Sequence, residues 1–349
     1  AFVLVASIFL VSFVSAMISP TEVRECSVLT QANKYYLLMN PLVPTDPSKP
    51  CIIITAPNIT FDGNSKLISN PNISTIAVYS NQPQTIIKYV RASMGKNGIG
   101  IKLENTDNSE IYGNILNENR IGLYAEDIDN SKIIKNIANS NYDDGSNYGR
   151  VYGIYLTGSN NEIRENTANY NTDHSNFGGR SYGLYIVGLS NDIYDNTANS
   201  TRVYGINGNS YGIYVAGNYN HIESDTTNGN YARTESYSYG VYVAGNDNIL
   251  DKITSALNQG NWFGTNIHIN GMNNLIKDSD LSLSSSFDAE MFSGTNNIFL
   301  NTVYDSAKEN VYSGELIRQW YLDIKVQNKS AVPIKDAEIR IYSASSNVA

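Results

Sequence analysis

The chain has 349 residues, with 24 Lys and Arg against 33 Asp and Glu, and a formal net charge of −9. Charged residues make up only 16 %, which excludes a disordered acidic tail, and the negative balance argues against a nucleic-acid binder. Three His and two Cys are too few for most multi-ligand soft-metal sites. The composition is instead rich in Asn (47), Gly (26) and Tyr (26), which is typical of a polar structural protein.

Residues 1–16 form an apolar run that is short for a membrane span and ends in Val14-Ser15-Ala16, a small-x-small cleavage pattern. We interpret it as a partial signal peptide, with an uncleaved anchor or a buried first element as the alternatives. The protein is therefore expected to be secreted or displayed on the cell surface. Two Cys in an exported chain usually pair, so Cys26 and Cys51 are predicted to form a disulfide; free thiols and metal ligands are the alternatives.

A repeat fills the middle of the chain. Its motif is Tyr-Gly-[Ile/Leu/Val]-Tyr-[aliphatic]-x-Gly, followed by Asn and an isolated Ile. The second Gly recurs at intervals of 30, 29, 28 and 26 residues from Gly158 to Gly271, and Gly100 lies 22 residues before Gly122. Helical apolar spacing is absent, and propeller blades have longer repeats. The pattern predicts an all-β fold, a single-stranded right-handed parallel β-helix over residues 17–313.

Two kinds of column follow from this register. Apolar residues at alternate positions are predicted to face inward, namely Ile99, Ile101 and Leu103, then Ile154 and Leu156 and their equivalents in later coils. Asn residues recur at the turns and are predicted to hydrogen-bond from coil to coil. These Asn columns are Asn114, Asn136, Asn166, Asn196 and Asp225, and Asn117, Asn139, Asn169, Asn199 and Asn228.

The segment Cys51-Ile-Ile-Ile-Thr-Ala-Pro-Asn-Ile-Thr-Phe-Asp-Gly-Asn64 resembles the opening coil of secreted parallel β-helix repeat proteins. The Asn-x-Ile-x-x-Asn units that follow resemble the repeat of that family, and the match covers residues 26–310. The family includes cell-surface proteins and the NosD-type proteins of copper-centre maturation, and it shares the pectin-lyase-like fold. The resemblance therefore implies a fold, whereas its motifs specify activity poorly.

Metal ligands are sparse in the sequence. A copper role would require clustered Met, His or Cys, which this chain lacks, so no transition-metal site is predicted. The hard oxygen ligands that Ca²⁺ prefers are offered by Asp143 and Asp144, or by Glu126, Asp127 and Asp129.

Residues 314–349 follow the last repeat. Alternating patterns predict two strands, Trp320 to Val326 and Ala337 to Tyr342, with a Pro-containing turn between them. The segment resembles the start of an Ig-like or carboxypeptidase-regulatory-like domain. We interpret it as the first hairpin of a truncated β-sandwich in a longer multidomain chain; the alternative is that it caps the β-helix.

One face of the β-helix is predicted to bind a ligand. Outward positions place five tyrosines in one column, which runs from Lys102 through the tyrosines to His268 and Glu290. A Gly column beside it (Gly100, Gly122, Gly153, Gly183, Gly212 and Gly240) is expected to form a flat shelf, and insertions at 142–150, 172–180, 201–209 and 230–237 a wall. Aromatic faces bind the apolar faces of sugars, so this groove is predicted to bind glycan; the alternative is a purely structural ladder. The tyrosines are Tyr124, Tyr155, Tyr185, Tyr214 and Tyr242.

The leading hypothesis is a non-enzymatic surface protein that acts in adhesion, in the envelope or in glycan binding, without a cofactor. The alternative is a polysaccharide lyase, hydrolase or epimerase, for which Asp173, His174 and Arg180 in the insertions are the candidate catalytic residues. Hydrolysis needs two carboxylates near one sugar bond, and the predicted floor of the groove offers none in its central coils. A second alternative is a structural spacer within a longer surface protein.

Overall fold

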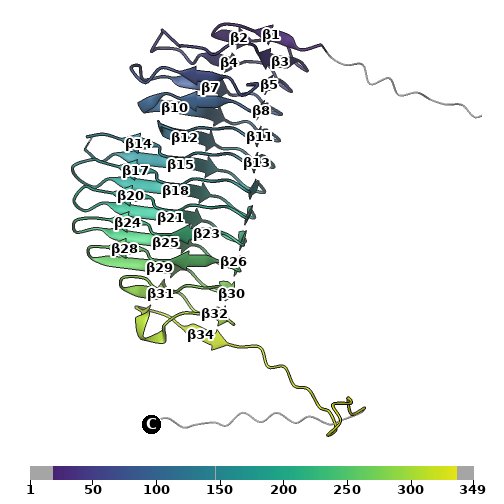
Figure 1. The fold of residues 1–349 in the computed structure, drawn as a ribbon, viewed down its shortest axis with the longest axis vertical. Coiled ribbons are helices and arrows are strands. Elements are labelled where there is room, and N and C mark those ends of the chain that lie inside the picture. The colour runs from purple at the N-terminus through teal and green to yellow at the C-terminus, as the bar shows by residue number, and fades with distance from the viewer. Residues whose placement is uncertain (1–18, 146, 336–349) are drawn as a thin grey trace, which may run out of the picture.

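The computed structural model describes residues 19–145 and 147–335. They form an elongated, all-β solenoid, in which successive coils stack along the long axis (Figure 1). Within these residues the helical content is a single 3₁₀ turn, η1 (Ser306–Lys308). This architecture confirms the predicted parallel β-helix, whereas the predicted signal peptide lies outside the described residues.

The long-strand sheet carries the Tyr-Gly-x-Tyr motif. Its twelve strands all pair in parallel with their neighbours in adjacent coils. In order they are β2 (Ser27–Leu29), β4 (Ile52–Ile54), β7 (Ile76–Ser80), β10 (Gly95–Glu104), β12 (Asn119–Glu126), β15 (Arg150–Thr157), β18 (Arg180–Val187), β21 (Asn209–Ala216), β25 (Tyr237–Ala244), β29 (Phe263–Asn270), β31 (Phe287–Ser293) and β33 (Glu309–Val311).

The short-strand sheet holds the isolated Ile of each repeat, for example Ile163 and Ile193. Its thirteen strands are β1 (Thr21–Val23), β3 (Tyr35–Leu38), β5 (Thr60–Asp62), β8 (Ile86–Lys88), β11 (Glu110–Tyr112), β13 (Lys132–Ile134), β16 (Glu162–Arg164), β19 (Asp192–Tyr194), β22 (His221–Glu223), β26 (Ile249–Asp251), β30 (Leu275–Lys277), β32 (Asn297–Leu300) and β34 (Leu316–Gln319).

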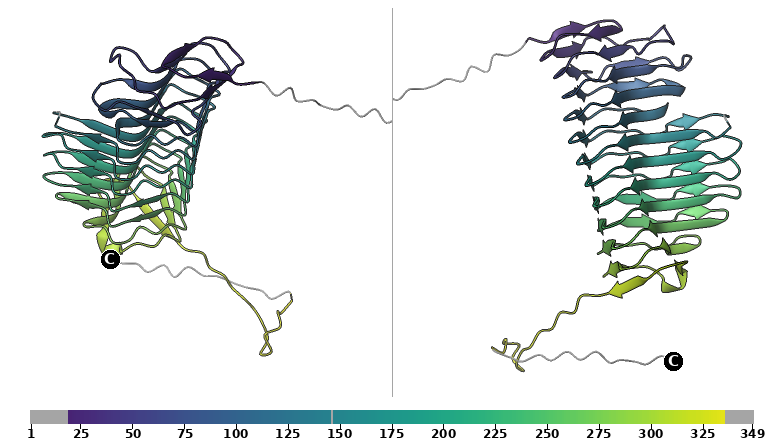
Figure 2. Two further views of the ribbon diagram at one scale, coloured as in Figure 1. Left: turned by 45° about the horizontal axis from the view of Figure 1, so that its top comes forward. Right: turned by 180° about the vertical axis from the view of Figure 1, so that it is seen from behind.

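The insertions build a third element, the wall. Each of the four predicted insertions contributes a two-residue strand to a five-stranded parallel sheet, and the segment before β29 contributes the fifth strand. This sheet stands beside the long-strand sheet (Figures 1 and 2). These strands are β14 (Tyr142–Asp143), β17 (Thr172–Asp173), β20 (Arg202–Val203), β24 (Tyr231–Ala232) and β28 (Gln259–Gly260). The remaining face has two short pairs, β6 (Leu67–Ser69) with β9 (Arg91–Ser93) and β23 (Thr226–Asn228) with β27 (Thr254–Ala256).

The core is a continuous column of aliphatic side chains. Ile154 and Leu156 are fully buried, as are their equivalents in the following coils, and this confirms the predicted inward row. Ile99 is an exception, because it is half-buried and pairs in register with Ile121 on the outer side of the sheet. The inward place in that stretch is taken by Gly100 instead.

Asparagine ladders connect the coils. In the predicted column the Asn136 backbone N–H donates to Asn166 Oδ1 at 2.9 Å, and Asn136 Nδ2 donates to the Ile111 carbonyl. The predicted half-buried column bonds similarly, with the Asn169 N–H donating to Asn139 Oδ1. Two further buried ladders account for more of the Asn content. The first consists of Asn119, Asn141 and Asn171 and, after a break, of Thr201, Asn230 and Asn258. The second consists of Ser131, Asn161, Asn191, Asn220, Asn248, Asn274 and Asn297.

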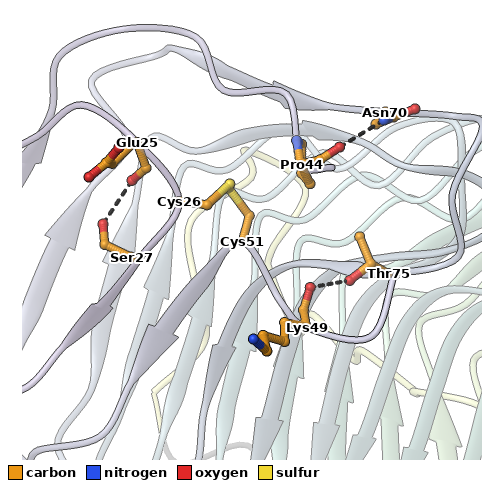
Figure 3. Close-up of a disulfide and its surroundings, with 8 residues drawn as sticks. All are labelled: Glu25, Cys26, Ser27, Pro44, Lys49, Cys51, Asn70 and Thr75. Atoms are coloured by element: carbon orange, nitrogen blue, oxygen red, sulfur yellow. Dashed lines mark hydrogen bonds between the residues drawn. A yellow bond between two sulfur atoms is a disulfide. The ribbon is translucent and has the colours of Figure 1, made fainter. Parts of the chain in front are cut away.

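The N-terminal coils are tied by a disulfide. Cys26 and Cys51 are bonded as predicted, and they lie immediately before β2 and β4, which are neighbours in the long-strand sheet (Figure 3). The disulfide therefore joins the first two coils at one corner.

The C-terminal end departs from the sequence interpretation. The short-strand sheet continues to Gln319, where β34 pairs with β32, beyond the predicted boundary at residue 313. Residues 320–326 contain no strand, so the first predicted strand is wrong within the described residues, and its apolar side chains are exposed there. The antiparallel pairing that the described segment does contain is a single bridge between Gln327 and Pro333. The second predicted strand lies outside the described residues.

Candidate functional site: the tyrosine face

The predicted tyrosines form one continuous stack, the outer Tyr column. Strand register places Tyr124, Tyr155, Tyr185, Tyr214 and Tyr242 directly opposite one another. Their ring centroids are separated by 4.5, 5.1, 4.9 and 5.0 Å, and the rings are within 11° of parallel. All five side chains are half-buried, so each ring presents part of its surface to solvent.

A second column lies beside it, the inner Tyr column of Tyr152, Tyr182, Tyr211 and Tyr239. These rings also stack, at 5.0, 4.8 and 5.2 Å. Tyr152, Tyr182 and Tyr211 are buried, and Tyr182 is only 3 % exposed, whereas Tyr239 at the end of the column is half-buried. They meet the outer column edge to face, as in the Tyr182–Tyr185 contact at 5.0 Å and 79°. Sequence analysis did not assign these residues a role, although the first Tyr of each Tyr-Gly-x-Tyr motif marks them.

The glycine column does not form a shelf beside the tyrosines, and this prediction is wrong. A Cβ atom on Gly153 would lie 2.6 Å from the Gly183 carbonyl oxygen and 2.8 Å from the Ala168 side chain, inside the coil. The same collision recurs at Gly183 and Gly212. These glycines are required because the backbone turns inward between the two tyrosines of each motif and leaves no room for a side chain.

The hydroxyls of Tyr155, Tyr214 and Tyr242 remain protonated over a wide pH range. Burial raises the pKa of Tyr214 to about 12, and it also raises the pKa of Tyr155 and Tyr242. The outer column is therefore an uncharged aromatic surface with hydrogen-bonding edges, the combination of properties that suits a sugar.

Two polar side chains border the outer column. At its N-terminal end the Lys102 ammonium lies 5.4 Å from the Tyr124 ring centroid and pairs with Glu104 at 2.6 Å. At its C-terminal end the His268 ring stacks on Tyr242 at 4.4 Å.

His268 forms a buried pair with Glu290. His268 Nδ1 lies 2.8 Å from Glu290 Oε2, and the two residues are only 5 % and 8 % exposed. A carboxylate at Nδ1 favours the tautomer that leaves Nε2 unprotonated. Nε2 has no hydrogen-bond partner within the described chain and keeps contact with solvent. Sequence analysis placed both residues in the column, but it did not identify their contact, because they are 22 residues apart.

The three candidate catalytic residues in the insertions are not equivalent. Asp173 is fully buried, and its two carboxylate oxygens accept the backbone N–H groups of Ser175 and Arg180. His174 is exposed and stacks on Tyr204 at 4.8 Å, whereas Arg180 is exposed at the start of β18. Asp173 thus organises its loop, and a joint catalytic role for the three residues stays a prediction.

The candidate calcium ligands do not gather. Asp143 is buried and contacts Arg120 at 3.6 Å, whereas the neighbouring Asp144 is exposed and contacts Lys96. Among the described residues one group has metal-ligand spacing, His221, Glu223 and Asp251 on the short-strand sheet. Lys252 pairs with Glu223 at 2.8 Å and Lys277 with Asp251 at 2.9 Å, so lysines already neutralise these carboxylates.

The chain is similar to known proteins in backbone structure, whereas comparisons of its sequence find no relative. No family model and no curated protein matches it. Among solved structures it is similar to the A-module of mannuronan C-5 epimerase AlgE6 of Azotobacter vinelandii (11 % identity, 83 % of each chain, TM-score 0.39). It is also similar to endopolygalacturonase I of Stereum purpureum (11 % identity, 87 % of this chain and 93 % of that chain, TM-score 0.31).

A third solved structure is the surface protein and adhesin PfbA of Streptococcus pneumoniae (10 % identity, 84 % of this chain and 89 % of that chain, TM-score 0.26). Likeness at this level carries no information on activity, so the function has to be sought in the residues of this chain. Within the described residues, no helix has the length and apolarity needed to cross a membrane.

Proposed function

We propose that the protein is an extracytoplasmic glycan-binding module that holds a polysaccharide along the outer Tyr column. The observation that carries the proposal is the row of five half-exposed, nearly parallel rings at coil spacing, which gives a strip of about 20 Å. A strip of this length suits several consecutive sugars of one chain. The Cys26–Cys51 disulfide supports a location outside the cytoplasm, because disulfides persist in oxidising compartments.

Sequence analysis left two alternatives for the tyrosines, a glycan-binding surface and a structural ladder, and the two Tyr columns suit one role each. Three of the four rings of the inner column are buried and support the sheet, whereas the outer column rests on them edge to face and keeps solvent-accessible surface. The outer rings are therefore held in place before any ligand arrives. Such preorganisation lowers the entropic cost of binding.

The test is retention of the whole chain on a panel of immobilised polysaccharides. A variant with Tyr155, Tyr185 and Tyr214 changed to Ala is expected to lose retention, because each substitution removes a ring on which a sugar can stack. A control variant changes Tyr170, Tyr219 and Tyr321, which are exposed away from the outer column, to Ala, and it is expected to retain binding. Equal retention by both variants would refute the proposal.

A second candidate function, lyase or epimerase chemistry on the bound polysaccharide, is favoured by the His268–Glu290 pair. The pair leaves Nε2 as a proton acceptor next to Tyr242. Incubating the wild-type chain with each retained polysaccharide and measuring chain length, unsaturation and C5 configuration tests this function. Products that form with wild type and not with His268→Gln would make the protein an enzyme, whereas unchanged polysaccharide would leave a binding module.

A further inference from the structure

Two arginines lie in register where the long-strand sheet meets the wall. Arg150 and Arg180 are the first residues of β15 and β18, they pair directly with each other, and both are exposed. The neighbouring Arg120 is held differently, because it contacts the Asp143 carboxylate at 3.6 Å and donates to the Arg150 carbonyl oxygen. Three arginines therefore lie in consecutive coils, and the first of them, Arg120, is paired with a carboxylate, that of Asp143.

The charge arrangement at Arg150 and Arg180 is unusual for this protein. Within the described chain neither guanidinium has a carboxylate within 4.0 Å, although acidic residues outnumber basic ones by 33 to 24. Like charges directly opposite each other on neighbouring strands destabilise a sheet. An acidic protein that keeps such a pair without a counter-charge has a natural place for an external anion.

The hydroxyls of the inner Tyr column lie beside the two arginines and accept hydrogen bonds from them, Tyr152 from Arg150 and Tyr182 from Arg180. Burial raises the pKa of Tyr152 and Tyr182, and the positive charges of Arg150 and Arg180 oppose that rise, so the guanidinium groups lie near these phenols. In the next coil Asn209 Nδ2 donates to the Tyr211 hydroxyl at 3.3 Å. The inner Tyr column therefore presents its hydroxyl edge toward the arginines.

We propose that Arg150 and Arg180 bind the anionic substituents, carboxylate or sulfate, of the polysaccharide that lies on the outer Tyr column. The inference rests on the proposed function. Both arginines belong to the strands that carry Tyr155 and Tyr185, so one ligand chain can contact rings and cations in the same two coils. The planar guanidinium matches carboxylate and sulfate oxygens with two parallel hydrogen bonds, which makes the ligand class polyanionic glycan.

The test compares matched charged and neutral probes. Affinities of the whole chain are measured for polygalacturonate against its methyl ester, and for dextran sulfate against dextran. Wild type is expected to prefer the charged member of at least one pair, and the preferred pair distinguishes carboxylate from sulfate. Added salt is expected to weaken that binding, because the arginines are exposed and screening acts within about 10 Å at 0.1 M.

The variant Arg150→Gln with Arg180→Gln is expected to lose about tenfold or more in affinity for the preferred anionic probe, with little change for its neutral partner. The charge-matched control changes Lys66 and Arg91 to Gln, on a different face, and is expected to bind like wild type. Equal affinity of wild type for charged and neutral probes, or equal loss in both variants, would overturn the inference while leaving the Tyr strip intact. Absence of binding to any probe, by contrast, would count against the proposed function itself.

Discussion

Asp225 occupies a ladder position that Asn holds in the four preceding coils. It is fully buried, and its Oδ1 accepts the Asn196 N–H and Asn196 Nδ2, as the Asn residues of the ladder do. Its Oδ2 has no hydrogen-bond partner and stands where Asn166 and Asn196 place an amide that donates to a carbonyl of the preceding coil. By register that carbonyl belongs to Ile193. A charged carboxylate there would face a carbonyl oxygen without any cation.

Asp225 is therefore expected to be protonated in the folded protein at neutral pH. Burial raises the pKa of Asp225 from 3.8 to about 8. Because the pKa of Asp225 is higher in the folded than in the unfolded protein, its contribution to the free energy of unfolding is fully present below pH 4. That contribution is lost as the pH rises through 8. Asp225→Asn supplies the missing donor without a charge, so it should stabilise the protein at pH 8.5 by something on the order of 3 kcal/mol, and much less at pH 4.

Urea unfolding of both proteins at pH 4, 6 and 8.5 checks this expectation, since pH effects of the other groups cancel in the difference between the two proteins. Asn196→Asp provides a comparison, because it adds a second buried carboxyl to the same ladder and should make stability fall more steeply with rising pH. A difference between wild type and Asp225→Asn that does not change with pH would mean that Asp225 does not titrate in this range.

At the scale of elements, the two Tyr columns are expected to respond differently to the same truncation. Removing a buried large aromatic side chain typically costs about 3–5 kcal/mol, so Tyr182→Ala should destabilise by about that amount. Tyr185 is half-exposed, and Tyr185→Ala should cost about 1–2 kcal/mol, because it removes edge-to-face contacts and a partly buried ring. Denaturant unfolding gives both values, and glycan retention should be lost with Tyr185→Ala under conditions where both variants are folded. Similar unfolding costs at the two positions would contradict this division of roles.

The repeat made the fold predictable because each coil has the same pattern of inward apolar residues and polar turns. The inward Ile154 and Leu156, the Asn ladders and the wall all follow from a register that the spacing of Gly158, Gly188 and Gly217 already defines. What failed was local. The alternation of inward and outward residues is interrupted at the Tyr-Gly step, where the glycine faces inward and the preceding Tyr182 is buried. A prediction that assumes strict alternation along the strand therefore misplaces both residues.

The candidate site was predictable only as a column. Register alone placed the outer tyrosines together, yet the His268–Glu290 hydrogen bond depends on side-chain conformations in two coils that differ from the consensus. Similarly, Asp173 looked available for chemistry in the sequence, because nothing local indicates that Ser175 and Arg180 direct their backbone N–H groups at its carboxylate. Contacts that cross coils outside the repeated motif therefore need the structure.

At the scale of the molecule, stability is distributed along one dimension, because each coil packs only on its two neighbours. Among the described coils, the first and the last each have one described neighbour, and they are the first expected to open. At the N-terminal end Cys26–Cys51 closes a loop with a sequence separation of 25, worth about 3.5 kcal/mol in the chain-entropy model. The disulfide thus ties the first described coil to the second by a covalent bond.

Replacing both cysteines by Ser is accordingly expected to loosen the first coils and to leave the tyrosine face unchanged. Amide hydrogen exchange should lose protection in β2 and β4, while β15, β18 and β21 keep theirs, because the lost constraint is transmitted only through neighbouring coils. Ser27→Ala, next to the disulfide, is the control and should leave exchange unchanged. If protection falls equally in β4 and β21, the solenoid opens as one cooperative unit, and local stability at the outer Tyr column would then depend on the disulfide some six coils away.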